Sequence, residues 1–194
     1  MERMGFIKSR VSASIELKQQ ILGDDKFLEV VSEVAEQCLQ VYKNGNKLLL
    51  AGNGGSAADS QHIAAEFVSR FEFDRPGLPA MALTTDTSIL TAVGNDYGYE
   101  QLFARQVEAN ALAGDMFVGI STSGNSPNIL AALDAAKAKG VITVGLAGSG
   151  GAIQTACDYC IAVPSTSTPT IQESHIMIGH IICAYVESAY FGKS

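Results

Sequence analysis

The sequence lacks an excess of basic residues. Its 13 lysines and arginines stand against 20 aspartates and glutamates, which gives a formal net charge of −7 at pH 7. A surface that binds nucleic acid or an anionic membrane carries a basic stripe, and this composition does not supply one. We therefore expect no nucleic-acid partner and no membrane partner, and we interpret the acidity as a contribution to solubility.

Two kinds of apolar segment are also missing. No apolar run approaches the roughly 20 residues that a membrane-spanning helix needs. Residues 1–20 mix lysine, arginine and glutamate with apolar positions and contain no hydrophobic stretch of a secretory signal. The expected location is therefore the cytoplasm.

Cysteine is scarce, with four in the chain. Cys157 and Cys160 form a C-x-x-C motif, but no second pair completes a zinc ribbon. The motif runs into an expected strand, in which successive side chains face opposite sides. We expect reduced thiols in or near the core.

The chain has 194 residues, 47% hydrophobic and 17% charged, which suits one globular domain over residues 1–194. Apolar runs predict strands at 48–51, 80–83, 116–120, 141–146 and 159–163. Helical segments are expected from Ser56, over 87–93, over 99–109, from Pro127, and over 170–189. This alternation predicts an α/β fold: a three-layer sandwich with a five-stranded parallel sheet, doubly wound as in flavodoxin.

Residues 1–45 predict a helical hairpin in front of the first strand. The first helix covers residues 3–22, and the second opens at Asp24 and Asp25 and ends before Asn44-Gly45-Asn46. An apolar stripe runs along the first helix: Phe6, Ile7, Val11, Ile15, Ile21 and Leu22. An apolar stripe of this kind is normally buried against another protein surface. Oligomer contacts and packing onto the chain's own domain are both open.

The stretch Lys47–Arg70 organises the candidate site. An apolar strand runs into Gly52-Asn53-Gly54-Gly55-Ser56, and helix-forming residues follow with Ser56 available as N-cap. Glycines let the backbone turn sharply and approach a ligand. A glycine turn that feeds a helix N-terminus presents free N–H groups to an anion.

A second loop of this kind follows the third expected strand. The segment Ser121-Thr122-Ser123-Gly124-Asn125-Ser126 has four hydroxyls, with Ser126 placed as N-cap before Pro127. Ligands of open α/β sheets bind beyond the carboxyl ends of the strands. Small hydroxyls without lysine suit a sugar phosphate held by hydrogen bonds, although an ordinary strand-to-helix turn is the alternative.

Nucleotide binding is less well supported. Gly52-x-Gly54-x-x-Ala57 matches the dinucleotide fingerprint, which requires an acidic residue about 20 positions later, after the second strand. The acidic residue at the end of that strand is Asp86, well beyond this spacing. No Walker loop is present.

Histidines on two helices supply candidate metal ligands or acid–base groups. His62 and Glu66 are four residues apart and share a helix face. On the last helix, Gln172 lies about 80° from His180, whereas His175 lies about 140° from it. Gln172 and His180 are separated by about 12 Å along the axis. Either both reach inward, or the site is assembled across a subunit interface.

Taken together, these motifs resemble the phosphoheptose isomerases of the sugar isomerase (SIS) family. The resemblance rests on Gly52–Ser56, His62-x-x-x-Glu66, Gly94-Asn95-Asp96, Ser121–Ser126 and Gln172-x-x-His175-x-x-x-x-His180. It covers residue 47 to the C-terminus, with similar helices before it. It implies a single SIS domain and a homotetramer that interconverts sedoheptulose 7-phosphate and glycero-manno-heptose 7-phosphate for lipopolysaccharide.

The resemblance also implies roles for individual residues. Glu66 and His180 would be catalytic. One zinc per subunit would be bound by His62, Glu66, Gln172 and His180. Substrate would contact Asn53, Gly54, Gly55, Ser56, Glu66, Asn95, Asp96, Ser121, Thr122, Ser123, Ser126 and Gln172.

The implied chemistry agrees with these residue types. An aldose–ketose shift moves a proton between adjacent carbons through an enediol, which needs a base, an acid and oxyanion stabilisation. Glu66 and His180 can supply base and acid, but a carboxylate bound to zinc is a poorer base, so the division of roles stays open. The alternative is a non-catalytic SIS adaptor that binds the replication initiator; adaptors of that type lack the acid–base pair.

Overall fold

Short apolar runs form the strands of one all-parallel sheet. In the computed structural model, which describes residues 2–192, the strands are β1 (Leu48–Gly52), β2 (Ala80–Ala82), β3 (Met116–Ser121), β4 (Ile142–Ala147) and β5 (Tyr159–Ala162). Their spatial order is β2-β1-β3-β4-β5. In the register, Leu48 of β1 is opposite Met116 of β3, and Met116 is opposite Ile142 of β4. The expected five-stranded parallel sheet is confirmed, with each strand boundary within one residue of its expected place.

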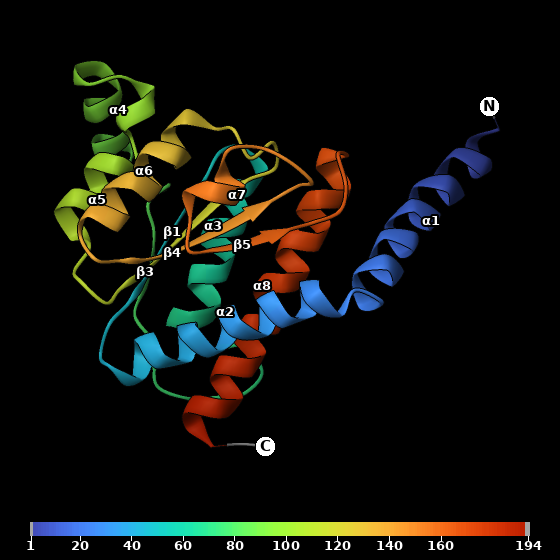
Figure 1. Ribbon diagram of the computed structural model, residues 1–194, viewed down its shortest axis with the longest axis horizontal. Coiled ribbons are helices and arrows are strands. Elements are labelled where there is room, and N and C mark those ends of the chain that lie inside the picture. Colours follow the sequence, from blue (N-terminus) through green and yellow to red (C-terminus); the bar gives the residue numbers. More distant parts are fainter. Residues whose placement is uncertain (1, 193–194) are drawn as a thin grey trace.

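Helices cover both faces of this sheet (Figure 1). One face carries α2 (Asp25–Lys43), α3 (Gly55–Val68) and α8 (Thr168–Phe191); the other carries α5 (Ala104–Asn110), α6 (Pro127–Ala138) and α7 (Ile153–Ala156). Side chains alternate along a strand. Leu48 and Leu50 therefore join the first core, whereas Leu49 and Ala51 join the second. The three-layer α/β sandwich is confirmed.

Two helices start at aspartates whose side chains cap them, whereas the cap expected for α3 differs. Asp24 and Asp86 accept N–H bonds from Phe27 and Ile89, as N-caps of α2 and of α4 (Thr87–Asp96). The expected Ser56 cap is wrong: α3 begins at Gly55, and Gly54, with φ of 57°, is the N-cap. A Cβ on Gly52 would lie 2.5 Å from the Ser56 carbonyl oxygen, so the turn tightens before Ser56 is reached.

The segment between β2 and β3 differs from expectation. The helix expected over 87–93 continues through Gly94-Asn95-Asp96, which form the last turn of α4. Gly98, with φ of 91°, then precedes a 3-10 turn as its N-cap. The helix expected over 99–109 is split into a 3-10 turn (Tyr99–Gln101) and α5.

The first helix, α1 (Arg3–Leu22), forms an arm that extends away from the body (Figure 1). It does not fold back along α2, so the expected hairpin is not the arrangement of these two helices. Leu17 and Ile21 at its base are buried. Large apolar side chains along the arm are exposed: Met4, Phe6, Ile7, Val11, Ile15 and Leu22. Packing onto the chain's own domain is therefore excluded for most of the stripe.

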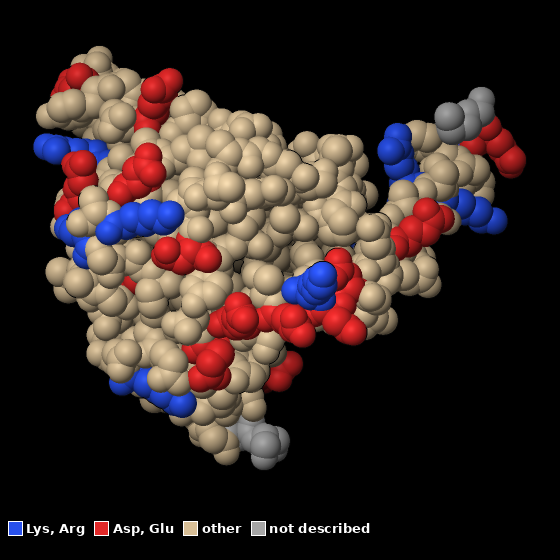
Figure 2. Space-filling model, viewed as in Figure 1, with Lys and Arg blue, Asp and Glu red and all other residues tan. Residues whose placement is uncertain are grey.

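Charge on the surface is acidic without a basic band on the face that Figure 2 shows. Aspartates and glutamates gather over α2, with a few lysines and arginines among them and others towards α5 and α6. Among residues 2–192, no helix has both the length and the hydropathy that crossing a bilayer requires.

Candidate active site

The two glycine- and serine-rich loops lie side by side at the carboxyl edge of the sheet. They follow β1 and β3, which are neighbours with Gly52 opposite Ile120. The side chains of Asn53 and Asn128 form a reciprocal amide pair across the two loops, with both N–O distances 2.9 Å. The first loop is thus in direct contact with the start of α6, the helix that the second loop feeds.

The Ser121–Ser126 loop gathers its hydroxyls. Ser121 and Ser126 are joined by a hydroxyl–hydroxyl bond of 2.8 Å, and Ser123 lies 3.5 Å from Ser121. Ser126 is the N-cap of α6 and Pro127 its first residue, as expected. Clustered hydroxyls at the start of a helix can donate several hydrogen bonds to one phosphate group.

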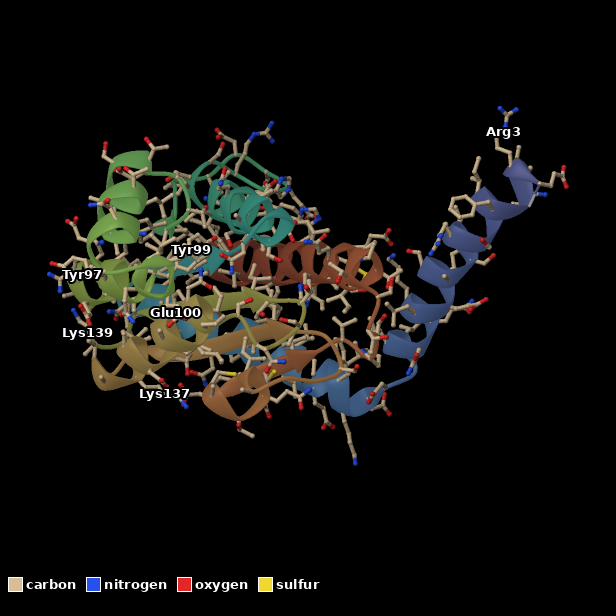
Figure 3. The ribbon with its side chains drawn as sticks, turned by 90° about the horizontal axis from the view of Figure 1, so that it is seen from above. Arg3, Tyr97, Tyr99, Glu100, Lys137 and Lys139 are labelled. Carbon is tan, nitrogen blue, oxygen red and sulfur yellow. The ribbon has the colours of Figure 1, made fainter. Side chains whose placement is uncertain are left out.

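Asn53 is held from two sides. Besides the pair with Asn128, its Oδ1 accepts a hydrogen bond from the Tyr99 hydroxyl at 2.9 Å. Tyr99 lies in the segment between α4 and α5 (Figure 3). Asn128 is 2% exposed, so its amide has no solvent to replace the bonds to Asn53. Sequence analysis missed both residues, although a polar side chain directly after Pro127 was a usable signal.

Replacing Asn128 with alanine should weaken binding of a sugar phosphate about tenfold. Two neutral hydrogen bonds to Asn53 would be lost, each worth about 0.5–1.5 kcal/mol. Calorimetric titration with the sugar phosphate would measure this. Asn110→Ala is the matched control, because the Asn110 amide bonds only within α5, to the Gln106 carbonyl. Unchanged affinity in Asn128→Ala would contradict the role of the amide pair.

A second group of side chains lies further along α3 and α8. His62 and Glu66 share one face of α3, with Nε2 of His62 3.2 Å from Oε1 of Glu66. His180 of α8 brings its Nε2 to 2.9 Å from Nε2 of His62. The helices approach closely because position 179 is glycine: a Cβ there would lie 2.6 Å from Ile63. The structure thus brings three of the four expected metal ligands together.

This trio fits a zinc ion. Its two imidazole nitrogens and one carboxylate oxygen all lie within 4.8 Å of one another. Nitrogen and oxygen donors of this kind bind zinc, and three protein ligands leave a position open for substrate or water. The His62 side chain is 51% exposed, so an ion can reach the site from solvent.

Gln172, the fourth expected ligand, lies elsewhere in the chain's own fold. A Cβ on Gly55 would be 2.4 Å from the Gln172 amide nitrogen, which places Gln172 at the start of α3. His180 lies at the level of His62, about 12 Å further along α8. Gln172 therefore belongs to the glycine-loop end of the site and not to the trio.

Asn95 and Asp96 are also apart from the other candidates. Both are exposed at the end of α4, where the Asn95 amide donates to Asp96 at 2.7 Å. Among residues 2–192, no hydrogen bond or ion pair joins them to another candidate residue. In Figure 1, α4 stands at the opposite end of the sheet from α8.

His175 is a buried structural residue. It is fully buried, and its Nε2 donates a hydrogen bond to the Ala147 carbonyl at 3.1 Å. Burial lowers the pKa of His175 from 6.5 to about 4, against a smaller opposing effect of that hydrogen bond. The expectation that His175 fits the metal site poorly agrees with this position.

The buried His175 should make stability depend on pH. Its folded pKa is below its unfolded pKa, so between pH 6.5 and about 4 the unfolded chain binds the proton more readily. Stability should therefore fall as pH falls through this window, by about 3 kcal/mol in total. Denaturant unfolding at several pH values measures the slope. The control is His175→Gln, whose side chain can still donate a hydrogen bond to Ala147 but does not titrate. If the unfolding free energy of this variant depends on pH just as steeply, the dependence comes from other groups.

A loop after α3 supports the trio. The Phe71 ring packs on the His180 imidazole, with ring centroids 5.4 Å apart. Glu187 accepts the N–H groups of Phe71 at 2.8 Å and Glu72 at 2.7 Å, and pairs with Arg75 at 2.8 Å. Sequence analysis missed this arrangement. A glutamate among the apolar residues in the second half of the last helix was the available signal.

Arg75 connects the loop to α3. Its guanidinium donates to the backbone carbonyls of Glu66 at 2.7 Å and Phe67 at 2.6 Å, near the C-terminal end of that helix. Carbonyls at helix ends lack partners within the helix, and a cation there is favoured. Arg75 and Glu187 thus fix the backbone beneath Glu66 and the aromatic contact of His180.

Comparisons with known proteins agree with this architecture. The SIS domain family model matches residues 19–148. The chain is 66% identical over 187 residues to a phosphoheptose isomerase of Aneurinibacillus thermoaerophilus, covering 96% of this chain and 94% of that protein. It is 64% identical over 189 residues to phosphoheptose isomerase 2 of Campylobacter jejuni, covering 97% of this chain and 94% of that protein.

Solved structures agree as well. A phosphoheptose isomerase structure from Francisella tularensis superposes with a TM-score of 0.93 at 36% identity, covering 97% of this chain and all of that chain. A phosphoheptose isomerase structure from Neisseria gonorrhoeae superposes with a TM-score of 0.89 at 41% identity, covering 95% of this chain and 98% of that chain. With near full-length identity above one half and a matching fold, the chain belongs to the SIS domain family, among the phosphoheptose isomerases.

Proposed function

We propose that the chain interconverts D-sedoheptulose 7-phosphate and D-glycero-D-manno-heptose 7-phosphate, the first step towards the ADP-heptose of the lipopolysaccharide core. The observation that carries the proposal is the juxtaposition of Glu66 with His180 across α3 and α8. An acid–base pair is what an aldose–ketose shift requires. The hydroxyl loop Ser121–Ser126, at the carboxyl edge of the same sheet, supplies the phosphate site.

The reaction needs one proton moved between neighbouring carbons. Removal of the C1 proton of the ketose gives an enediol, and delivery of a proton to C2 gives the aldose. Glu66 and His180 exchange the roles of base and acid between the two directions, as microscopic reversibility requires. Ser121, Ser123 and Ser126 hold the 7-phosphate, while Asn53, Gly54, Gly55 and Ser56 offer polar groups to the sugar.

Zinc is the proposed cofactor, one per subunit. His62, Glu66 and His180 would hold it, and Gln172, the fourth ligand that the family resemblance implies, would have to come from a second subunit because within one chain it lies at the other end of the site. A bound zinc ion supplies Lewis-acid polarisation of the sugar carbonyl. Phe71 shields one face of His180 from water, and Arg75 fixes the backbone of Glu66, so the two side chains keep their mutual orientation.

We further propose that the site is completed across subunits of a homotetramer in the cytoplasm. Gln172, Asn95 and Asp96 lie away from the trio within one chain, while His62 is open to solvent. The exposed apolar stripe of α1 offers a surface for a second copy. The acidic surface accords with a soluble enzyme of small molecules.

Placing aspartate at Val11 should reduce the size of the assembly. Val11 is 55% exposed in the isolated chain, so the charge would not disturb its own fold. Buried between subunits, an unpaired carboxylate would cost several kcal/mol. Light scattering coupled to size exclusion would show dimers or monomers instead of tetramers. Ser12→Asp, at an exposed polar position on the same arm, adds the same single charge and is the matched control; an intact tetramer in Val11→Asp would remove α1 from the interface.

The activity is tested with metal-stripped protein and sedoheptulose 7-phosphate in D₂O, with and without added zinc. We expect an aldoheptose phosphate with deuterium at C2, observed by NMR, and faster formation with zinc. Product without deuterium would contradict proton exchange through an enediol. No product in either tube would favour the adaptor alternative, for which the paired Glu66 and His180 give no support.

A further inference from the structure

Cys157 and Cys160 lie together on the face of the sheet that α7 covers. Both thiols are free and half-buried, and both pack against the core formed with α6. Cys160 is opposite Gly145 in the register of β5 and β4. A Cβ on Gly145 would lie 2.9 Å from Cys157 Sγ, so the missing side chain at position 145 makes room for the Cys157 sulfur beside Cys160.

The two thiols are in contact. Cys157 ends α7, and the chain turns at Asp158 before it enters β5. This turn brings Cys157 to the same face as Cys160, which a continuous strand would not do. The Cys160 thiol donates a hydrogen bond to the Cys157 sulfur. Because β5 is an edge strand, small oxidants can reach the pair from solvent.

Cys157 is also the more reactive partner. The hydrogen bond from Cys160 lowers the pKa of Cys157 below that of an ordinary thiol, in spite of its burial. Lys137, at the end of α6 near α7 (Figure 3), favours the thiolate further. A thiolate is the form that attacks an oxidant.

One residue connects this pair to the phosphate loop. The Cys157 thiol donates to the Ile153 carbonyl at 3.1 Å, and the Ile153 N–H donates to the Gly124 carbonyl at 2.9 Å. Next to it, the Ala152 N–H donates to Asn125 Oδ1 at 3.0 Å. The contact is tight, since a Cβ on Gly151 would lie 2.5 Å from the Gly124 backbone. A displacement of α7 is therefore transmitted to the Ser121–Ser126 loop.

We propose that Cys157 and Cys160 are a redox modification site whose reversible disulfide loosens the phosphate loop. With a peroxide as oxidant, the Cys157 thiolate attacks one oxygen, the O–O bond breaks, and a sulfenic acid forms. The Cys160 sulfur then attacks the Cys157 sulfur, the S–S bond forms, and water leaves. In total two thiols and one hydrogen peroxide give one disulfide and two waters. The Cys157 S–H that bonded Ile153 is lost, and the sulfur moves to Cys160.

The disulfide is tested by treating reduced protein with hydrogen peroxide and mapping the digest by mass spectrometry without reduction. We expect a peptide with Cys157 and Cys160 linked, two hydrogens lighter and restored by dithiothreitol. Cys38 and Cys183 are the internal control, because both are buried and burial raises the pKa of each thiol, that of Cys183 to about 12. Absence of the 157–160 link overturns the proposal.

Hydrogen exchange and kinetics test the link to the loop. Oxidation should speed amide exchange over residues 121–126 about fivefold or more and raise KM by a similar factor. In Cys157→Ser and in Cys160→Ser, oxidation should change neither the amide exchange of this loop nor KM. Either variant alone is a sufficient control if the other does not fold. Unchanged exchange in disulfide-linked protein overturns the coupling. The KM readout rests on the proposed function; if reduced protein shows no turnover, that function fails while the exchange result still decides this inference.

Discussion

Glu66→Gln and His180→Ala should each lower kcat by about 10²- to 10⁴-fold while the fold persists. This is the range over which a positioned acid or base accelerates proton transfer. Glu66→Gln keeps the shape of the side chain and removes the charge. Turnover of sedoheptulose 7-phosphate, followed by NMR of the product, measures the loss.

Two controls separate chemistry from folding in these variants. Glu173→Gln removes a carboxylate from α8 whose side chain is 51% exposed, and it should retain activity. Thermal melting should show that both active-site variants unfold within a few degrees of the parent protein. Activity within tenfold of the parent in either variant would contradict its role as acid or base.

Breaking the Arg75–Glu187 pair should cause the largest loss of stability. The two side chains are only 2% and 1% exposed. Removal of one partner leaves a buried charge without its counterion, which costs about 3–5 kcal/mol. Denaturant unfolding of Arg75→Ala and Glu187→Ala measures this. The exposed Arg105–Glu108 pair is the matched control, where Glu108→Ala should change stability by less than about 1 kcal/mol.

The same pair predicts a response to acid. Burial raises the pKa of Glu187, but the N–H donors of Phe71 and Glu72 and the Arg75 guanidinium outweigh this effect and lower it. The unfolded chain therefore takes up the proton first as pH falls, and the stabilisation is lost below the ordinary pKa of glutamate, about 4.3. An Arg75→Met/Glu187→Leu double variant should lose this acid response, and its persistence there would assign the response to other carboxylates.

Periodicity and capping were sufficient to predict the strands and most helices. Each strand is a short apolar run, such as Leu48–Gly52, and such runs can be recognised locally. His62 and Glu66 could be paired because four residues make one helical turn. Two errors lie at helix starts and breaks: Gly54 displaced the N-cap from Ser56, and the helix expected over 99–109 is interrupted at Leu102 and Phe103.

Contacts between distant segments could not be predicted in the same way. The pairing of Asn53 with Asn128, and of Arg75 with Glu187, joins residues far apart in the sequence, and no local pattern specifies the partner. The 157–160 motif shows the same limit, since its thiols meet only because the chain turns at Asp158. The axial distance between Gln172 and His180 follows from helical rise alone, but the sequence left open whether both side chains reach one site within a chain.

Gly179 allows α3 and α8 to approach closely, and the helix separation sets the distance between His62 and His180. Zinc binds imidazole nitrogen at about 2.0–2.1 Å, whereas calcium takes oxygen ligands at about 2.3–2.6 Å. His62 and His180 come from different helices, so the helix separation sets the span of their nitrogens. A methyl group at position 179 would press on Ile63 and widen that span. The absence of a side chain at position 179 thus sets how far apart the two imidazoles of the proposed zinc site lie.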